Sequence, residues 1–212
     1  MCTVVYKLGG SLLDLPDLAR RLHSFLEQPF PFSGKSQHGD QFRRLLVVGG
    51  GSVADAVRRW DKVHDLGDEL AHRLAMQSMS FNAELVAAIL GEARIVATRI
   101  EARDAWAEGQ IAVLAAAEFV DAEERASQNV LPRSWHVTSD SVAAYVAIRW
   151  PAAALVLLKS VPIPAACSAE TAANRGFVDA YFPQLAGRIP RVGWVNLRAD
   201  DRATQNWLES GS

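Results

Sequence analysis

The sequence predicts an α/β protein in which helices cover both faces of a mostly parallel sheet. Short apolar runs with the character of strands alternate along the chain with amphipathic stretches at helical spacing. Two of the strand-like runs end in glycine-rich turns, and a helix-like stretch follows each turn. Because this alternation is typical of βαβ units, we expect ligands to bind beyond the carboxyl ends of the strands.

The first half of the chain carries both glycine-rich turns. A strand is expected at Val4–Leu8 and a helix at Pro16–Gln28, where the proline suits the first helical turn. Pro29–Gln41 is rich in Pro, Gly, Ser and polar residues and predicts a surface loop. A second strand is expected at Leu45–Val48, followed by helices at about Val53–Val63 and at Leu66–Leu90.

The second half continues the alternation and contains no internal repeat, so we expect a single domain over residues 1–212. A short segment that contains Trp106 separates the first two strands of this half. The expected elements, in order, are strands at Arg94–Ala97 and Ile111–Ala115, a loop at Ser127–Arg133, a helix at Ser139–Trp150, a strand at Leu155–Leu158, a last strand at Val192–Leu197 and a closing helix at Asp200–Leu208.

Composition excludes several classes of protein. With 22 basic and 24 acidic residues the net charge is −2, which is not the strongly basic character of a nucleic-acid-binding protein. Cys2 and Cys167 are too few for a disulfide framework, so a reducing compartment is expected. No signal peptide and no apolar run long enough to span a bilayer is seen. These features predict a cytoplasmic protein without a membrane partner.

Lys7-Leu8-Gly9-Gly10-Ser11 forms the first candidate site, directly after a strand. Glycines let backbone amides approach an anion closely, and the following helix start adds partial positive charge. Lys7 supplies a mobile charge for a phosphate oxygen. An ordinary glycine-rich turn with a solvated lysine explains the same pattern equally well.

Gly49-Gly50-Gly51-Ser52 forms the second candidate site, after the strand at Leu45–Val48. Three successive glycines cost roughly 0.5–1 kcal/mol each relative to alanine, so some feature must require the freedom. Close approach to a ligand is one reason, and a tight turn with positive φ is the other. Two turns of this kind in one chain are more specific than either alone, and both should open onto the same sheet edge.

Thr138-Ser139-Asp140-Ser141 forms the third candidate site, at an expected helix start. A helix N-cap followed by an acidic first turn accounts for this pattern. Alternatively, Asp140 orients lysines or nearby backbone around a transferring phosphoryl group. The two roles are compatible.

In their order along the chain these motifs resemble those of the amino acid kinase family. The resemblance lies in Val5–Ser11, Val47–Gly51 and Thr138–Ser141. Within the family the chain more closely resembles the kinases of methanofuran biosynthesis, which phosphorylate [5-(aminomethyl)furan-3-yl]methyl phosphate to its diphosphate. The stretches that carry this closer resemblance are His72–Met76, Ser134–Ser141 and Val178–Pro183.

The resemblance implies a three-layer αβα sandwich, a homodimer and an ATP-dependent kinase for a small phosphate or carboxylate acceptor. Mg²⁺ is expected to bridge phosphates rather than sit in a protein cage, and no metal site made by the protein alone is expected. The implied roles fall into three groups: catalytic Lys7, Asp140 and Lys159; ATP-binding Gly9, Gly10, Ser11, Ser139 and Ser160; and acceptor-facing Gly49, Gly50 and Gly51.

Two further residues are candidates for binding the acceptor. Arg58 lies in the expected helix that follows the second glycine motif, and its guanidinium suits a phosphate; a solvated helix face is the alternative. His136, with Trp135, precedes Asp140 and suits stacking on a planar ring, although ordinary packing fits equally well.

The chain departs from the family pattern at two places. Where relatives commonly carry a Thr-Asp-Val-Asp-Gly type of segment that contributes to the nucleotide pocket, this chain reads Leu158–Pro162. Relatives also carry a late lysine near the phosphates; here Lys159, Arg175 or Arg188 would have to serve. These differences motivate an alternative, a non-catalytic nucleotide- or anion-binding regulatory protein.

Overall fold

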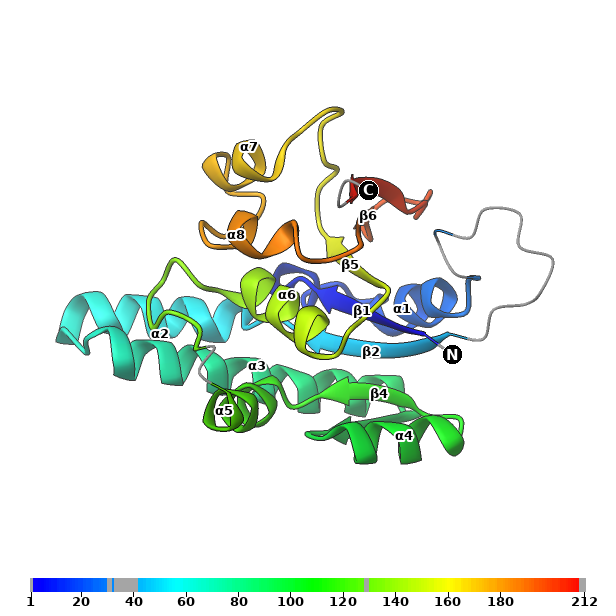
Figure 1. The fold of residues 1–212 in the computed structure, drawn as a ribbon, viewed down its shortest axis with the longest axis horizontal. Helices are drawn as coiled ribbons and strands as arrows, with labels where there is room; N and C mark the ends of the chain where they lie inside the picture. Colours follow the sequence, from blue (N-terminus) through cyan, green and yellow to red (C-terminus); the bar gives the residue numbers. More distant parts are fainter. Residues whose placement is uncertain (1, 30–31, 33–41, 128–129, 210–212) are drawn as a thin grey trace.

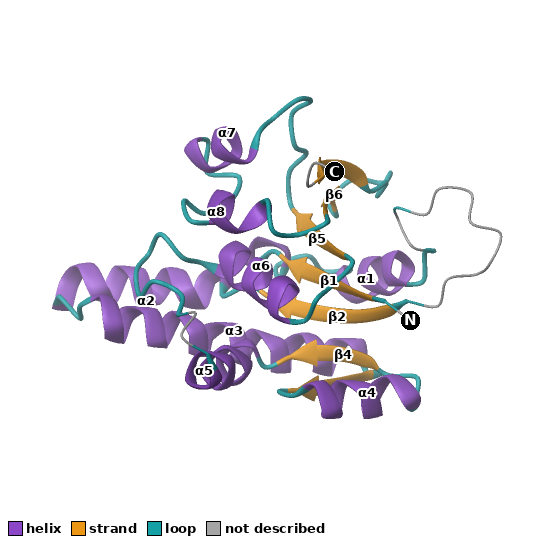
Figure 2. Ribbon diagram, viewed as in Figure 1, coloured by secondary structure: helices purple, strands orange, loops and turns teal. Residues whose placement is uncertain are grey.

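The computed structural model describes residues 2–29, 32, 42–127 and 130–209, and its central sheet confirms the α/β class. Neighbouring strands run parallel except at one edge, where the last two are antiparallel. Figure 2 shows the strands as orange arrows among the purple helices. In spatial order the seven strands of this part of the chain are β3 (Ala93–Val96), β4 (Ile111–Leu114), β2 (Arg43–Val48), β1 (Thr3–Leu8), β5 (Ala154–Lys159), β6 (Arg191–Asn196) and β7 (Gln205–Glu209).

Helices cover both faces of this sheet, which confirms the three-layer arrangement. One apolar core contains side chains of the first group of helices, α1 (Leu18–Leu26) and α3 (Asp68–Leu90). The other core lies under the second group, α4 (Arg99–Ala107), α5 (Ala116–Ala126), α6 (Ser139–Arg149), α7 (Ala169–Asn174) and α8 (Phe182–Ala186). A short 3₁₀ helix, η1 (Gly10–Leu12), follows β1.

Strand β1 shows how the sheet separates the two cores. Val4, Tyr6 and Leu8 belong to the core under α1 and α3, whereas Val5 belongs to the opposite core. Because successive side chains of a strand point to opposite faces, Lys7 points to the face that α6 covers. The side chain is buried there despite its charge.

Helices α2 (Gly51–His64) and α3 lie side by side and extend together beyond the sheet (Figure 1). Helix α2 starts at the second glycine motif and ends with Asp65 in the left-handed region at φ 49°. Helix α3 is the longest helix of the described chain. Among the described residues, neither α3 nor any other helix combines the length and the apolar character that crossing a bilayer requires.

The closing helix expected at Asp200–Leu208 is wrong. Residues 205–209 form strand β7, which pairs antiparallel with β6, so Val192–Leu197 does not mark the last strand. The reason is tertiary: Trp207 packs edge-on against Trp194 and stacks on Phe182, with ring centroids 5.2 and 5.8 Å apart. Its indole N–H also donates to the carbonyl of Cys167 at 2.7 Å.

Four helices escaped the sequence analysis. The segment around Trp106 is helix α4, whose start at Thr98 has a capping box with Glu101. Helix α5 and the short α7 and α8 were also not expected. The loops expected at Pro29–Gln41 and Ser127–Arg133 lie partly outside the described residues.

Replacing Phe182 by alanine tests the packing that holds β7. Phe182 is fully buried, so we expect the truncation to lower the free energy of unfolding by about 3–5 kcal/mol through lost burial and a residual cavity. The measurement is urea unfolding followed by circular dichroism. Phe81→Ala is the matched control: Phe81 is 60% exposed on α3, and its loss should change stability by no more than about 0.5 kcal/mol. Equal effects of the two substitutions would contradict the assignment.

Candidate active site

The two glycine motifs meet at the carboxyl edge of the sheet, as expected. They follow the neighbouring parallel strands β1 and β2, and the amide of Gly49 donates to the carbonyl of Leu8 at 2.9 Å. On the other side the amide of Gly9 donates to the carbonyl of Leu158 at 2.8 Å. The ends of β1, β2 and β5 are thus joined directly through backbone.

Backbone contact between the two loops explains the need for glycine. A Cβ atom on Gly10 would lie 2.2 Å from the nitrogen of Gly51, and one on Gly50 would lie 2.4 Å from Oγ of Ser78. Gly51 also has φ +50°, in the left-handed region. Positive φ, one of the two reasons that the sequence left open, therefore occurs in this motif, and the close approach in the structure is to protein atoms of the other loop and of α3.

Several backbone amides in these loops have no backbone acceptor within the part of the chain that the structure describes. They belong to Gly10, Ser11, Gly50 and Gly51, at the start of η1 and of α2. Unpaired amides at a helix start, together with the helix dipole, favour a negatively charged group. The edge between β1 and β2 therefore has the donors that an anion such as phosphate requires.

A buried ion-pair cluster lies next to these loops. Nζ of Lys7 lies 2.9 Å from Oδ1 of Asp140, and Nζ of Lys159 donates to Oδ2 of the same carboxylate at 2.8 Å. Lys159 also donates to the carbonyl of Phe177 at 2.7 Å. One carboxylate thus holds two ammonium groups, and the three charges together carry an excess of one positive charge.

Strand pairing brings these groups together. Lys7 of β1 is in register with Leu157 of β5, so Lys159, two residues beyond Leu157, points to the same face. Asp140 stands in the first turn of α6, which covers that face. Three segments distant in sequence therefore meet at one point.

The environment shifts the pKa values of two of these groups. Burial alone would raise the pKa of Asp140, but the ammonium groups of Lys159 and Lys7 outweigh it and lower the value to about 2. Burial lowers the pKa of Lys159 to about 8. The positive charge of Lys7 also lowers this pKa, whereas the negative charge of Asp140 raises it. Asp140 is consequently ionised throughout the neutral range.

Of the three candidates for the late cationic position, the structure brings Lys159 to Asp140. The guanidinium of Arg175 lies over the ring of Phe177 at 5.1 Å, and Arg188 is exposed. Within the described residues, no group of three or more His, Cys, Asp or Glu side chains is arranged to hold a metal. The groups that lie against the Asp140 carboxylate in the structure are the ammonium groups of Lys7 and Lys159.

The serines of the expected ATP site lie at the same edge. Oγ of Ser11 donates to Oγ of Ser160 at 3.1 Å, which links the loop after β1 to the loop after β5. Oγ of Ser139 lies 3.0 Å from the position that a Cβ atom on Gly49 would occupy. Arg198, in the connection after β6, donates to the carbonyl of Ser11 at 2.9 Å and was not anticipated.

Asn82 is a second residue that the sequence analysis missed. It is buried in α3, and its amide donates to the carbonyl of Gly49 at 2.8 Å. Since carbonyl and amide point in opposite directions across a trans peptide, this bond turns the amide of Gly50 away from α3. The available signal was polar Ser78 and Asn82, four residues apart, among apolar residues of the helix.

The acceptor candidates Arg58 and His136 are not brought onto the lysine cluster. Arg58 pairs with Asp55 at 3.1 Å and lies over the ring of Trp135 at 4.5 Å. The indole of Trp135 donates to Asp61 at 2.7 Å, which ties this segment to α2. His136 is exposed, and its carbonyl accepts from the amide of Tyr181 at 3.1 Å.

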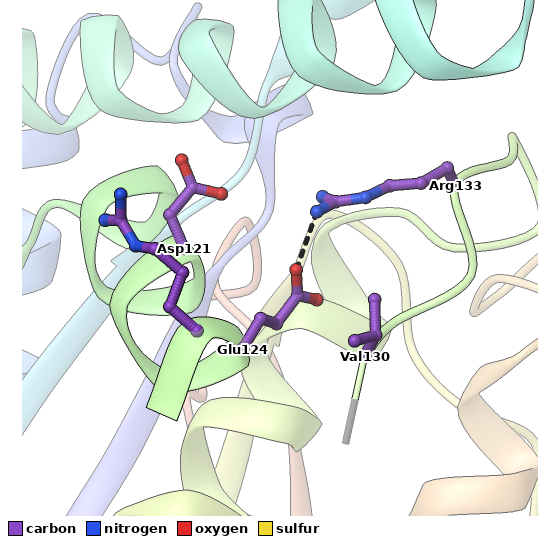
Figure 3. A pocket seen from close by; sticks show the side chains of 5 residues that line it. Asp121, Glu124, Val130 and Arg133 are labelled. Carbon is purple, nitrogen blue, oxygen red and sulfur yellow. Dashed lines mark hydrogen bonds and ion pairs between the residues drawn. The ribbon is translucent and has the colours of Figure 1, made fainter. Parts of the chain in front are cut away.

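One hollow adjoins the site, and a second is lined by none of its residues. One of about 300 Å³ lies beside the segment after β5 and is lined by Pro162, Trp194, Asn196 and neighbouring residues of the β6–β7 connection. The other, of about 290 Å³, lies along α5, where Figure 3 shows Glu124 joined to Arg133. None of the residues that line the second hollow belongs to the glycine loops or the lysine cluster.

Comparison with known sequences gives one family and one curated relative. The model of the amino acid kinase family matches residues 3–163. A protein named [5-(aminomethyl)furan-3-yl]methyl phosphate kinase, from Methanocaldococcus jannaschii, is 26% identical over 143 residues, which is 67% of this chain. The match spans 58% of that relative's length.

Solved structures of nucleotide kinases share the fold. UMP kinase from Ureaplasma parvum aligns with a TM-score of 0.63 at 16% identity, covering 96% of this chain and 92% of its own. Uridylate kinase from Archaeoglobus fulgidus aligns with a TM-score of 0.57 at 16% identity, covering 91% and 89%. At these identities the likeness establishes the fold alone.

Replacing Asp140 by asparagine tests the ion-pair cluster. The substitution leaves two buried ammonium groups without a counter-charge, so we expect a loss of about 3–5 kcal/mol in the free energy of unfolding at pH 7. Because the folded-state pKa is about 2 and the ordinary value is 3.8, the carboxylate stabilises the fold fully above about pH 4. The difference between wild type and variant should shrink as pH falls towards 2. Urea unfolding at a series of pH values measures it.

Asp55→Asn is the matched control, because Asp55 forms an exposed ion pair with Arg58 on α2. Its effect should stay within about 1 kcal/mol. A small, pH-independent effect of Asp140→Asn would show that the cluster contributes nothing to stability.

Proposed function

We propose that this chain, which belongs to the amino acid kinase family, transfers the γ-phosphoryl group of ATP to a phosphate or carboxylate oxygen of a small molecule. In this reaction a bond forms between the acceptor oxygen and the γ-phosphorus. The bond from that phosphorus to the β,γ-bridging oxygen breaks, and ADP leaves with the electron pair. Such chemistry depends on positioning and on neutralising charge more than on covalent help from the protein.

The observation that carries the proposal is the pair of lysines held by one aspartate beside the glycine loops. Lys7 and Lys159 share the Asp140 carboxylate and retain one excess positive charge in a buried setting. An ammonium fixed in a low-dielectric site stabilises charge that develops on transferring phosphoryl oxygens far better than one in water. Asp140 acts as the residue that orients both ammonium groups.

The glycine loops supply the positioning. The amides of Gly10 and Ser11 would hold donor phosphates, and those of Gly50 and Gly51 would face the acceptor and the phosphoryl group in transfer. Because the loops touch through Gly10 and Gly51, the two sets of donors lie side by side. Donor and acceptor oxygens would therefore meet next to Lys7.

The hollow beside Pro162 is the proposed place of the nucleoside of ATP. It lies directly after Lys159 and Ser160, at the carboxyl end of β5, and reaches the ring of Trp194. Mg²⁺ bound together with the nucleotide would supply positive charge that neutralises part of the phosphate charge. Asp140 is not proposed as a ligand of this cation, because its carboxylate is paired with Lys7 and Lys159.

For the acceptor we propose [5-(aminomethyl)furan-3-yl]methyl phosphate of methanofuran-type one-carbon cofactor biosynthesis. The curated relative with that name, at 26% identity, supports this choice. Arg58 and His136 remain candidates for the acceptor side if the segment around Trp135 moves on binding.

A cytoplasmic homodimer is part of the proposal, and light scattering of the purified chain measures its mass.

The alternative is a non-catalytic nucleotide- or anion-binding regulatory protein. The specific observation that favours it is the segment Leu158–Pro162, which differs from the acidic segment common in relatives. Calorimetric titration with ATP and ADP, paired with a turnover assay, separates the two functions. Tight nucleotide binding without turnover over a panel of phosphate and carboxylate acceptors would establish the alternative.

Lys7→Met tests the proposed function. The apolar stem is kept and the ammonium is lost, so we expect kcat for ADP formation to fall roughly 10²–10³-fold with the furan phosphate as acceptor. The measurement is a coupled ADP assay with that acceptor, and with UMP as a comparison. Circular dichroism verifies that the variant is folded.

Lys62→Met is the matched control, since Lys62 is exposed on α2 and should leave kcat unchanged. Wild-type turnover in Lys7→Met would remove Lys7 from the mechanism. Turnover with UMP but not with the furan phosphate would keep the kinase and refute the proposed acceptor.

A further inference from the structure

Asp179 is a half-buried residue outside the glycine motifs whose carboxylate accepts six hydrogen bonds. One oxygen, Oδ2, accepts from the amide of Thr138 at 3.0 Å, the hydroxyl of Thr138 at 2.9 Å and the amide of Ser141 at 2.9 Å. The other oxygen, Oδ1, accepts from the hydroxyl of Ser141 and from the amides of Tyr181 at 3.3 Å and Phe182 at 3.1 Å. Four of these partners are backbone amides, which can only donate, and two are hydroxyls.

These bonds fix the start of two helices at once. Thr138 occupies the N-cap position of α6 but makes no capping bond with its own side chain. The amide of Ser141, in the first turn, is satisfied instead by Asp179 from a segment 38 residues away. The amide of Phe182, at the start of α8, is satisfied by the same carboxylate. The first turn of α6, which carries Asp140, is therefore tied to residues 179–182.

The same segment also holds the lysine partner of Asp140. The carbonyl of Phe177, two residues before Asp179, accepts from Nζ of Lys159 at 2.7 Å. Residues 177–179 therefore bind Lys159 through the carbonyl of Phe177. They bind the first turn of α6, which carries Asp140, through the carboxylate of Asp179. The ion pair between Asp140 and Lys159 spans the gap between these two attachment points.

We propose that Asp179 is a positioning residue for phosphoryl transfer, which sets where Asp140 holds the ammonium groups of Lys159 and Lys7. The inference rests on the proposed function, because it assigns Asp179 a part in that reaction. It touches neither donor nor acceptor and acts through α6. A displacement of about 1 Å in a group that stabilises the transition state is enough to lower a rate on the order of 10²-fold.

Charge gives the proposal a second observable. The charged groups around Lys159 are Asp140, Lys7 and Asp179, and both carboxylates raise its pKa while burial and Lys7 lower it. Burial and the neighbouring Asp140 raise the pKa of Asp179 itself, and its donors act in the opposite direction. Loss of the Asp179 carboxylate therefore lowers the pKa of Lys159 below its wild-type value.

Asp179→Asn is the test variant. Asparagine has a single acceptor oxygen, so three of the six donors would face an NH₂ group whichever way the amide is turned. The chain contains four lysines, Lys7, Lys35, Lys62 and Lys159, so protein labelled with ¹³C at lysine Cε gives few signals, which single lysine substitutions assign. We expect the pKa of Lys159 to fall and kcat to drop at least about tenfold.

Thr98→Ala is the matched structural control. It removes the N-cap of α4, at the end of β3, three strands away from β1 in the sheet. We expect it to lower Tm while the pKa of Lys159 and kcat keep their wild-type values. If Asp179→Asn lowers Tm but leaves the pKa of Lys159 or kcat unchanged, Asp179 only caps helices and the proposal is overturned.

Two further results bear on the proposal: a test variant that does not fold, and a wild-type chain that shows no turnover. If Asp179→Asn does not fold, the double variant Thr138→Val, Ser141→Ala takes its place, because it removes both hydroxyl donors and keeps the carboxylate. A wild-type kcat together with a wild-type pKa of Lys159 in this double variant would overturn the proposal. If the wild-type chain shows no turnover with any acceptor, the kinase function fails. In that case the pKa of Lys159, compared between wild type and Asp179→Asn, still shows whether Asp179 positions Asp140 against Lys159.

Discussion

One carboxylate between two buried ammonium groups is the interaction on which the rest of this site depends. Removing three charges from water is costly, and only their mutual attraction offsets it. The attraction requires that β1, β5 and α6 keep their relative positions to within a fraction of an ångström, because Lys7, Lys159 and Asp140 each come from a different element. Electrostatics and sheet register are therefore coupled: the site is intact only if the strands pair as they do.

The glycine loops show the same coupling in the backbone. Each loop alone is a flexible turn, but Gly10 and Gly51 approach so closely that neither tolerates a side chain. Hydrogen bonds from Gly9 and Gly49 to neighbouring strand ends hold the loops in place. The remaining amides are thereby fixed at one edge, next to the lysines. Preorganised donors of this kind need no rearrangement when charge develops, which is the property that phosphoryl transfer exploits.

Residues 177–182 support the ion-pair cluster from outside the sheet. The segment directly after β5, residues 160–162, carries no acidic side chain, and the strand itself ends at Lys159. Its ammonium is held from outside the sheet by the carbonyl of Phe177 and by Asp140, which Asp179 steadies through α6. This support comes from residues far along the chain, whereas the register of β5 beside β1 brings Lys159 next to Lys7 and Asp140.

The sequence by itself determined the features that depend on near neighbours. Alternating apolar runs defined six of the strands, and the glycine turns after β1 and β2 identified the edge at which Lys7 and Asp140 lie. Only the tertiary structure decided between Lys159, Arg175 and Arg188, turned the expected closing helix into β7 and brought Asn82 and Asp179 onto the site. Local periodicity reflects the burial of one element, whereas ion pairs, aromatic stacking of Trp207 and capping by Asp179 depend on which distant segments meet.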